Sequence, residues 1–373
     1  MSRYLVAPLN WGLGHATRCI PLIQSFLDEG HEVIIGGDGE SLTLLRKHFP
    51  QLRYVRLAPL SLRYSKRSSQ VGAMLRSIPQ LISWAVRDHA MIQTLVREQH
   101  IDHIVSDNRF GLFLKRPSKP DAAMPQTIYI THQLYIMLPK GWRWLEPLAA
   151  RMHARIYMRY NKVWVPDYEA PAHSLSGVLG HPLHADENPW FREHLSYIGP
   201  LSRFERQRTS SLSEPATQPS AASTVAVLSG LEPQRTMLEK QLIAHFSAAG
   251  SEEHPVSVLI VQGLPNRPNT RITLPCGPGK KGRITIVPHL SDTEMAAALL
   301  HARHIIARSG YSTIMDLAAL GLLRPGHTGS GLNPRSASAG APFVSLIPTP
   351  GQPEQEYLAE MHVRSVDEPI MEK

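Results

Sequence analysis

Short apolar runs alternate with helical patterns along most of this chain, and that alternation constrains the fold more than any other feature of the sequence. Residues 4–8 form an apolar run, residues 16–27 carry apolar side chains three and four positions apart, and residues 32–35 form the next apolar run. Spacings of three and four are typical of one helix face, and short apolar runs are typical of buried strands. The start of the chain therefore predicts a strand, a helix and a second strand, the unit from which parallel sheets are built.

The same alternation continues in both halves of the chain. In the first half it predicts strands at residues 101–105, 127–130 and 163–165 and a long helix at 71–99. In the second half it predicts strands at 224–228, 256–261, 283–287, 304–307 and 343–347, with helices at 234–248, 292–301 and 312–320. We therefore expect an α/β protein made of two Rossmann-like, doubly wound domains.

A stretch rich in Ser, Thr, Pro and Gln separates the two halves. Residues 205–223 read ERQRTSSLSEPATQPSAAS and show no apolar periodicity, which is typical of a linker. A chain of 373 residues also exceeds what one compact core usually organises. We predict a first domain at residues 1–204, a linker at 205–222 and a second domain at 223–373. A comparable stretch at 324–340 is expected to be a surface insertion.

Composition places the chain among globular proteins and narrows its partners. Hydrophobic residues make up 42% and charged residues 19%, and no apolar run approaches the ~20 residues that cross a bilayer. The sequence opens without a signal-peptide pattern, and Cys19 and Cys276 form no Cys-x-x-Cys pair, so we expect a cytoplasmic protein with two buried thiols. A net charge of +8 favours anionic partners. Because zinc-finger, RNP-like and helix-turn-helix patterns are missing from the sequence, we expect phosphates of lipids or nucleotide sugars and no nucleic acid.

The loop after the first predicted strand reads NWGLGHATR. Gly12 and Gly14 permit backbone geometry that other residues avoid, and they let a ligand approach the main chain. We expect Thr17 to cap the following helix and Pro21 to fall in its first turn, with the helix amides facing the loop. Thr17 stands where the dinucleotide fingerprint has its third glycine, and no Walker lysine follows, which disfavours NAD and P-loop binding.

His15 is the distinctive residue of this loop, and two interpretations of it stay open. It could pack at the start of the helix, or it could act as a general base near neutral pH. The loop after residues 101–105 reads SDNRFG and places Asp107, Asn108 and Arg109 together where a strand ends. These residue types are typical of an Asx turn. Asp107 is also a candidate to hold the His15 imidazole or to contact a substrate hydroxyl.

Loops of the second half carry candidate phosphate donors. Ser229 and Gly230 follow the strand at 224–228, and Arg235 could meet a phosphate bidentately, although a plain strand-to-helix turn is the alternative. The loop and helix start after residues 304–307 read RSGYSTIMD, which suits a diphosphate. The candidates there are Arg308, Ser309, Gly310, Tyr311 and Ser312, and His289 is a further candidate after the strand at 283–287.

An acidic residue follows one helical turn after Ser312. The carboxylate of Asp316 lies on the same side of the predicted helix as Ser312, where it could accept both hydroxyls of a ribose. The alternative is an acid that complements the helix dipole. After the last predicted strand, residues 348–357 read PTPGQPEQEY and include Gln352, Gln355 and Glu356.

The stretches GLGHATR, SG, RSGYSTIMD and PTPGQPEQEYLA together resemble the GT-B glycosyltransferases of the MurG-like, family 28-type group. The resemblance spans both halves and is strongest in roughly the last 90 residues. It implies two Rossmann-like domains facing a cleft, with a nucleotide-diphosphate sugar, UDP-linked in our expectation, bound mainly by the second domain. It further implies that Ser309 and Gly310 face the diphosphate and that Asp316 binds the ribose. Gln355 and Glu356 match the pair that contacts sugar hydroxyls, with Gln352 beside them.

The resemblance also implies an activity, the inverting transfer of a hexose or N-acetylhexosamine to a lipid-linked or saccharide acceptor. Gly14 and His15 match the N-terminal glycine loop, with Gly12, Thr17, Asn108 and Arg109 as candidates to line the acceptor side. In the expected mechanism a base removes the acceptor proton, while the helix start at Gly310 and Arg308 or Arg235 stabilise the departing nucleotide diphosphate. We expect no cofactor and no metal, because the helix dipole and an arginine can neutralise that charge. A hydrolase or epimerase of the same fold, or a protein that binds nucleotide sugars without turnover, remains an alternative.

Residues 139–164 mix aromatic and basic side chains. The aromatic residues are Trp142, Trp144, Tyr157 and Tyr160, and the basic ones are Lys140, Arg143, Arg151, Arg155, Arg159 and Lys162. Aromatic anchors beside basic residues suit an anionic membrane surface, so peripheral contact with the inner face of the cytoplasmic membrane is one expectation. The other is an ordinary amphipathic helix with a solvated basic face.

Overall fold

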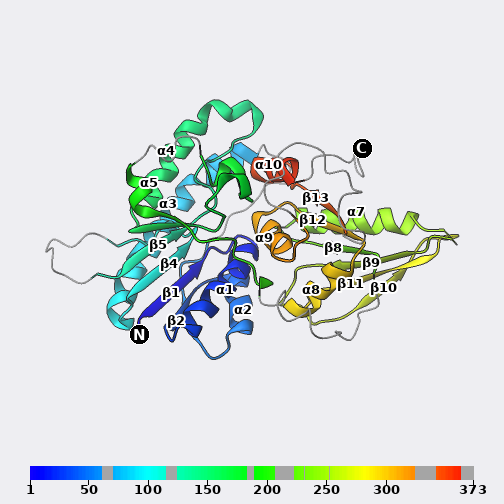
Figure 1. Ribbon diagram of the computed structural model, residues 1–373, viewed down its shortest axis with the longest axis horizontal. Helices are drawn as coiled ribbons and strands as arrows, with labels where there is room; N and C mark the ends of the chain where they lie inside the picture. The colour runs from blue at the N-terminus through cyan, green and yellow to red at the C-terminus, as the bar shows by residue number, and fades with distance from the viewer. Residues whose placement is uncertain are drawn as a thin grey trace. The chain divides into compact units, whose positions relative to one another are not determined.

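The computed structural model describes residues 1–60, 70–114, 124–182, 189–205, 222–230, 232–251, 253–323 and 342–362 (Figure 1). It divides the chain into two compact units, Met1–Arg203 and Phe204–Lys373. Most of the predicted linker and the whole predicted insertion at 324–340 lie outside the described residues. Each unit has its own sheet.

The first unit contains a sheet of seven parallel strands in the order β3-β2-β1-β4-β5-β6-β7. The strands are β1 (Arg3–Pro8), β2 (Glu32–Gly37), β3 (Arg53–Arg56), β4 (His103–Asp107), β5 (Gln126–Ile130), β6 (Lys162–Val165) and β7 (Leu195–Tyr197). The helices are α1 (Gly14–Asp28), α2 (Gly39–His48), α3 (Gln70–Gln99), α4 (Glu146–Tyr157) and α5 (Pro189–His194), with short 3-10 turns η1 (Lys140–Leu145), η2 (Pro171–His173) and η3 (Gly177–Leu179).

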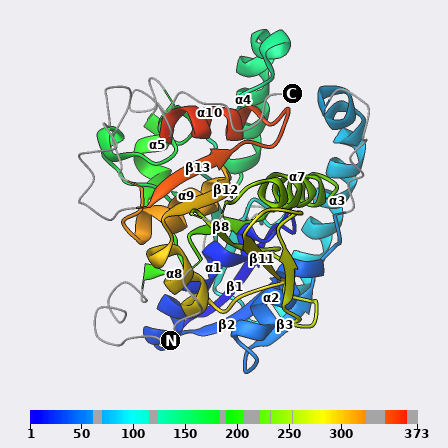
Figure 2. The same cartoon turned by 90° about the vertical axis from the view of Figure 1, so that its right-hand side faces the viewer.

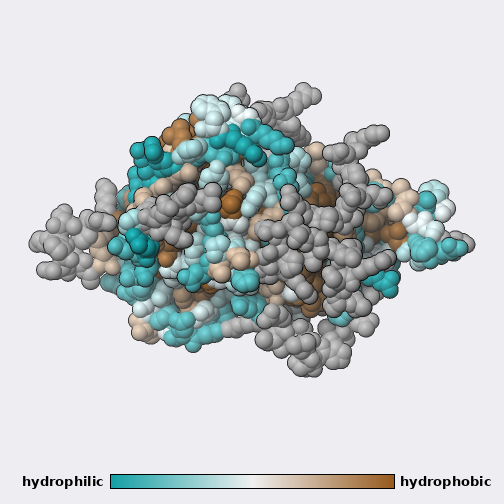
Figure 3. Space-filling model, turned by 45° about the horizontal axis from the view of Figure 1, so that its top comes forward, coloured by the Kyte–Doolittle hydropathy of each residue, from teal (hydrophilic) through white to brown (hydrophobic). Residues whose placement is uncertain are grey.

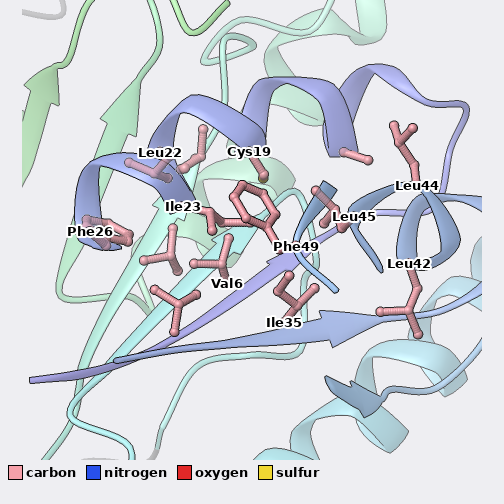
Figure 4. Close-up of a cluster of buried hydrophobic side chains, with 14 of the residues drawn as sticks. Val6, Cys19, Leu22, Ile23, Phe26, Ile35, Leu42, Leu44, Leu45 and Phe49 are labelled. Atoms are coloured by element: carbon pink, nitrogen blue, oxygen red, sulfur yellow. The ribbon is translucent and has the colours of Figure 1, made fainter. Parts of the chain in front are cut away.

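Alternate residues of the central strands point into two hydrophobic cores, one on each face of this sheet. Val6 and Ile35 pack with side chains of α1 and α2, such as Ile23 (Figure 4). Leu5 and Ile34 pack with side chains of α3 and α4 on the other face. Figure 2 shows α1 and α3 on opposite sides of β1. A strand turns successive side chains to opposite faces, so a sheet covered on both sides needs uninterrupted apolar strands. This explains why the sequence shows short apolar runs there and no polar alternation.

The chain reverses direction across the first sheet at β1. It runs outward from β1 to β2 and β3 and then returns to the other side of β1 at β4, where Pro8 pairs with Asp107. Open α/β sheets bind ligands outside the carboxyl ends of their strands beside such a switch point. The loops after β1 and β4 therefore occupy the favoured place in this unit.

The second unit repeats the plan with a six-stranded sheet in the order β10-β11-β9-β8-β12-β13. The strands are β8 (Thr224–Val227), β9 (Val256–Val261), β10 (Ile272–Pro275), β11 (Gly282–Val287), β12 (His304–Arg308) and β13 (Phe343–Ile347). The helices are α7 (Gln234–Ala248), α8 (Asp292–His301), α9 (Tyr311–Ala319) and α10 (Pro353–His362). Among the strands of the described residues, β10 alone runs antiparallel to its neighbour, and the switch point lies between β8 and β12. The predicted fold class, two doubly wound α/β sheets, is confirmed.

The start of α1 differs from the prediction. The amide of Thr17 donates to the Leu13 carbonyl at 2.9 Å, so the helix begins at Gly14 and Thr17 lies within its first turns. The Thr17 hydroxyl donates to the Gly14 carbonyl at 3.0 Å and caps nothing. Pro21 lies well inside the helix. The prediction that Thr17 caps α1 and that Pro21 falls in its first turn was therefore wrong.

Candidate active site

Three side chains meet at the switch point of the first sheet. His15 Nδ1 lies 3.0 Å from Asp107 Oδ1, and Arg18 Nε donates to Asp107 Oδ2 at 2.6 Å. Arg18 Nη2 also donates to Asp107 Oδ1 and lies 2.8 Å from His15 Nδ1. Asp107 and Arg18 are buried, whereas 15% of the His15 side chain is exposed. The buried Asp107 carboxylate therefore binds two side chains, the buried Arg18 guanidinium and the His15 imidazole, which is partly exposed.

The surroundings of this cluster set its charges. Burial lowers the pKa of His15 from 6.5, an effect that Asp107 opposes and Arg18 reinforces. Burial would by itself raise the pKa of Asp107, but the Arg18 and His15 charges and hydrogen bonds hold it well below its usual range. At neutral pH the cluster is then a neutral imidazole beside an ionised carboxylate and an arginine. That is the state in which a histidine can accept a proton.

Sequence reasoning missed two members of the cluster. Arg18 stands in the NWGLGHATR stretch, but it lies off the apolar face of the predicted helix, where an arginine is expected to point to solvent. His132 follows β5, and its Nδ1 lies 3.3 Å from Arg18 Nη1. The sequence could have pointed to His132 because it stands just after a predicted strand, where ligand-binding residues of open α/β sheets lie. Cys19 is buried as expected, with its Sγ 3.7 Å from Asp107 Oδ2, and burial raises its pKa.

Arg109 has a different environment from the one predicted for an acceptor ligand. Its guanidinium is fully buried and bonds to the carboxylates of Asp88, at 2.8 and 2.9 Å, and Asp38, at 2.8 Å. It also donates to the carbonyl of Ala58 at 2.7 Å and lies over the Trp84 ring. These contacts join the β4 loop to α3 and the start of α2. We assign Arg109 this structural role and no ligand contact.

The other predicted residues of this loop region shape the backbone. Asn108 has a φ of +56°, and its Oδ1 accepts a hydrogen bond from the Tyr129 hydroxyl at 2.8 Å. Gly12 has a φ of +75°, which glycine adopts without strain, and a Cβ there would meet no atom within 4 Å. Gly14 is the first residue of α1. The space beside Gly12 and the N-terminal turn of α1 lie next to His15.

The second unit places its candidate residues at three adjacent strand ends. Ser229 and Gly230 follow β8, Ser309 and Gly310 follow β12, and residues 348–352 follow β13. Gly310 is the residue before α9, with a φ of −71° and a ψ of +143°, values that any residue adopts. A Cβ at Gly310 would meet no atom within 4 Å. The fold therefore does not require glycine here, whereas a ligand approaching the backbone would.

The two predicted phosphate-binding arginines are engaged with protein groups. Arg308 is buried and donates to the carbonyls of Pro348, at 2.9 Å, and Gln234, at 3.0 Å. Arg235 donates to the Gln262 carbonyl at 3.2 Å and pairs with Glu232. Arg308 thus ties β12 to the β13 loop and to the start of α7. The backbone around Gly310 is a better candidate for the diphosphate than either guanidinium.

The first turn of α10 fixes the loops around it. The Gln355 carbonyl accepts a hydrogen bond from the Ser309 hydroxyl at 2.7 Å, and the Gln355 side chain accepts one from the Thr349 amide at 2.8 Å. Glu356 accepts from the Gly351 amide at 3.3 Å. The Gln352 amide donates to the Thr349 carbonyl at 3.1 Å. Residues predicted to contact a donor sugar therefore also brace the loop that carries them.

The remaining candidates lie on α9 and after β11. Tyr311 is buried, and Ser312 and Asp316 are half-buried on the same helix. His289 follows β11, which β9 separates from β8, so His289 lies away from the β8–β12 switch point. The structure brings together the β8, β12 and β13 loops and leaves His289 outside that group.

The described residues hold neither a candidate metal site nor a helix that could span a membrane. No group of three or more His, Cys, Asp or Glu side chains in the described part of the chain could hold a metal ion. No helix within those same ranges is both long and apolar enough to cross a membrane. The expectations that metal and cofactor are not needed stay predictions.

Comparison with known proteins places this fold among glycosyltransferases. No protein-family model matches the chain. A curated uncharacterized glycosyltransferase from Methanosarcina acetivorans is 24% identical over 326 residues, which cover 83% of this chain and 75% of that protein.

Solved structures extend the likeness over nearly the whole chain. The glycosyltransferase of kitacinnamycin is similar with a TM-score of 0.53 at 14% identity, covering 96% of this chain and 82% of that one. Phytolacca americana UGT2, solved with UDP-2-fluoroglucose and pterostilbene, is similar with a TM-score of 0.53 at 12% identity, covering 97% and 83%. The fold is that of the GT-B glycosyltransferases, as the sequence resemblance predicted. The narrower resemblance to the MurG-like group stays a prediction.

Proposed function

We propose that this protein is an inverting glycosyltransferase that moves a hexose or N-acetylhexosamine from a UDP-linked sugar to a lipid-linked or saccharide acceptor. The observation that supports it best is the 3.0 Å contact between His15 Nδ1 and the Asp107 carboxylate at the switch point of a GT-B sheet. A histidine oriented by a buried carboxylate is a general arrangement for a catalytic base. His15 is assigned that role.

Asp107 selects the tautomer that the reaction needs. When Nδ1 carries the proton it donates to the ionised Asp107 carboxylate, which leaves Nε2 with a free lone pair. In the opposite tautomer Nδ1 would accept a hydrogen bond from Arg18 Nη2. Its lone pair would then face a lone pair of Asp107 Oδ1, and the two would repel. We assign the Nδ1–H form because a carboxylate accepts hydrogen bonds and cannot donate when ionised.

The chemical step is a single displacement. The acceptor hydroxyl gives its proton to His15 Nε2 while its oxygen bonds to the anomeric carbon. The bond between that carbon and the diphosphate oxygen breaks, and its electron pair leaves with the nucleotide diphosphate. We assign stabilisation of this leaving charge to the backbone around Gly310 and the start of α9, because helix N-terminal amides favour anions. No metal or cofactor takes part in the proposed step.

The test is an assay of nucleotide release from a panel of nucleotide sugars, with and without lipid-linked and saccharide acceptors. Release that depends on an acceptor supports transfer. Release without acceptor indicates a hydrolase, isomerised sugar indicates an epimerase, and binding without release indicates a non-catalytic protein. Any of these three outcomes would contradict the proposal.

The base is tested with His15→Ala in the same assay. We expect transfer to fall about 10²- to 10⁴-fold, the usual contribution of a general base. The exposed His100 supplies a matched control, because it lies between α3 and the amino end of β4, and His100→Asn removes its imidazole while keeping a residue that tolerates its φ of +50°. Full transfer by His15→Ala with a verified donor would rule out His15 as the base.

A further inference from the structure

An exposed apolar stripe runs along η1 and α4 of the first unit. Trp144 is 74% exposed, Leu148 52% and Met152 49%, and these residues follow one another at intervals of four. Leu148 and Met152 are four apart on α4, so these two side chains lie on one side of that helix, and Trp144 lies at the end of η1 directly before it. Trp142 on η1 is 37% exposed beside them. We call Trp142, Trp144, Leu148 and Met152 the η1–α4 stripe.

Exposed cations accompany the stripe. Lys140, Arg143, Arg151 and Arg155 are all exposed on the same two elements. Glu146 is the only carboxylate between residues 124 and 166 of the sequence. It is buried and accepts hydrogen bonds from the Tyr135 hydroxyl and the Leu138 amide, so it does not offset the cations at the surface. Figure 3 shows brown and pale side chains beside teal ones at the upper edge of the molecule, where α4 lies in Figure 1.

The structure corrects the sequence prediction about which aromatic residues face solvent. Tyr157 and Tyr160 are each 3% exposed and pack in the core beneath β4, β5 and β6. They therefore cannot act as surface anchors. The two tryptophans, one leucine and one methionine of the η1–α4 stripe take that place.

We propose that the η1–α4 stripe docks this protein on an anionic lipid bilayer. Tryptophan rings settle at the boundary between headgroups and acyl chains, and Leu and Met side chains insert into the acyl region. The four cations would meet anionic headgroups, and the one carboxylate of residues 124–166 is buried. Leu148 and Met152 favour a bilayer over nucleic acid. A nucleic acid would stack its bases on the tryptophan rings and bind its phosphates to the cations, which gives the aliphatic side chains no partner, whereas acyl chains do. A second copy of the same face would bring like charges together.

The test is sedimentation of the full chain with vesicles of phosphatidylcholine containing one fifth phosphatidylglycerol, at low salt. We expect binding at least tenfold tighter than to pure phosphatidylcholine vesicles and a blue shift of tryptophan fluorescence. Trp144→Glu/Met152→Glu should weaken binding more than tenfold, and Met237→Glu, at an equally exposed methionine on α7, should not. Arg151→Glu/Arg155→Glu should abolish the preference for anionic vesicles, and the exposed control Arg192→Glu/Lys240→Glu should keep it.

Three outcomes of the vesicle assay would overturn the proposal, and a fourth comes from measuring self-association. They are equal binding to the two kinds of vesicle, retention of binding by both stripe variants, and release from vesicles by a single-stranded oligonucleotide that binds the stripe more tightly. Self-association that the stripe variants abolish would instead assign the surface to a second copy. The vesicle assay contains no sugar donor, so its failure would leave the proposed glycosyl transfer untouched.

Discussion

At the scale of single residues, the most informative group is the buried Asp107 carboxylate with its two partners. From the sequence, Asp107 was one candidate to hold the His15 imidazole, beside an Asx turn, because both residues follow strands that a doubly wound sheet can place side by side. It could not predict Arg18, since helical periodicity assigns that position to solvent and burial of a guanidinium depends on a carboxylate 89 residues away. Arg109 follows β4 as predicted, but it pairs with Asp38 and Asp88 rather than facing the loop as the predicted acceptor ligand. The sequence could not show this pairing, because the two carboxylates come from elements that lie far apart in the chain.

The His15 pKa gives the reaction a defined pH dependence. Burial lowers this pKa from 6.5, so the neutral base is present at pH 7 and activity should be lost only as pH falls below about 6.5. Asp107 raises the pKa of His15, so Asp107→Asn should move the acid limb of kcat/KM to lower pH while reducing kcat. The measurement is kcat/KM against pH for both forms. An acid limb that stays in place would argue against the assigned pair.

Removing Arg18 should destabilise the first unit. Arg18→Met leaves the Asp107 carboxylate buried without its arginine, and breaking a buried pair costs about 3 to 5 kcal/mol. In Arg18→Met/Asp107→Asn the uncompensated charge is gone, so part of the loss should return. Urea unfolding followed by circular dichroism measures both effects, with Arg192→Met on exposed α5 as the control. A change below about 1 kcal/mol for Arg18→Met would contradict the structural role of the pair.

At the scale of elements, strands with longer apolar runs were predictable and short strands with few apolar residues were not. β9 and β13 were predicted at their observed bounds, because their sequences VSVLIV and FVSLI are mostly apolar runs. β3, β7 and β10 have the sequences RYVR, LSY and ITLP, which carry too few apolar residues for a periodicity. They are strands because a neighbour offers hydrogen bonds. β4 begins and ends two residues later than predicted, which places Asp107 within the strand end.

The turn between β12 and α9 gives a prediction about donor binding. Because Gly310 has an ordinary φ and open space at its Cβ position, Gly310→Ala should leave the melting temperature unchanged. If a diphosphate approaches the backbone there, the added methyl group should raise KM for the donor more than tenfold, with a smaller effect on the KM for the acceptor. Gly141→Ala is the control, since its Cβ position is equally open and it lies on η1 of the first unit rather than in the second unit. An unchanged donor KM would remove Gly310 from the proposed site.

At the scale of the whole molecule, two sheets of related topology each carry candidate residues at their own switch point. This duplication was readable from the sequence, because both halves repeat strand and helix units with glycine loops after their first strands. The bracing by Arg308, which joins β12 to the β13 loop and the start of α7, was not readable. It depends on which carbonyls the folded strands bring within reach of one side chain.

A nucleotide that binds the second unit should stabilise the protein. At 100 times its dissociation constant, a ligand that binds only the folded state adds about 2.7 kcal/mol. We expect UDP or a UDP sugar to raise the melting temperature and to increase amide hydrogen-exchange protection at the start of α9. Gly310→Ala should need more nucleotide for the same rise. A nucleotide panel that produces no shift would contradict the proposed donor class.

The parallel pairing of β1 with β4 also orders events during synthesis. His15 and Asp107 are 92 residues apart, so their contact cannot form until β4 has left the ribosome. At typical elongation rates the delay is on the order of 5 to 20 s. Throughout that interval the hydrogen-bonding edge of β1 that β4 later pairs with has no native neighbour. β1 is therefore the first strand made but gains its second neighbour only after β2 and β3 have been made, and a chaperone that covers this edge would act during that interval.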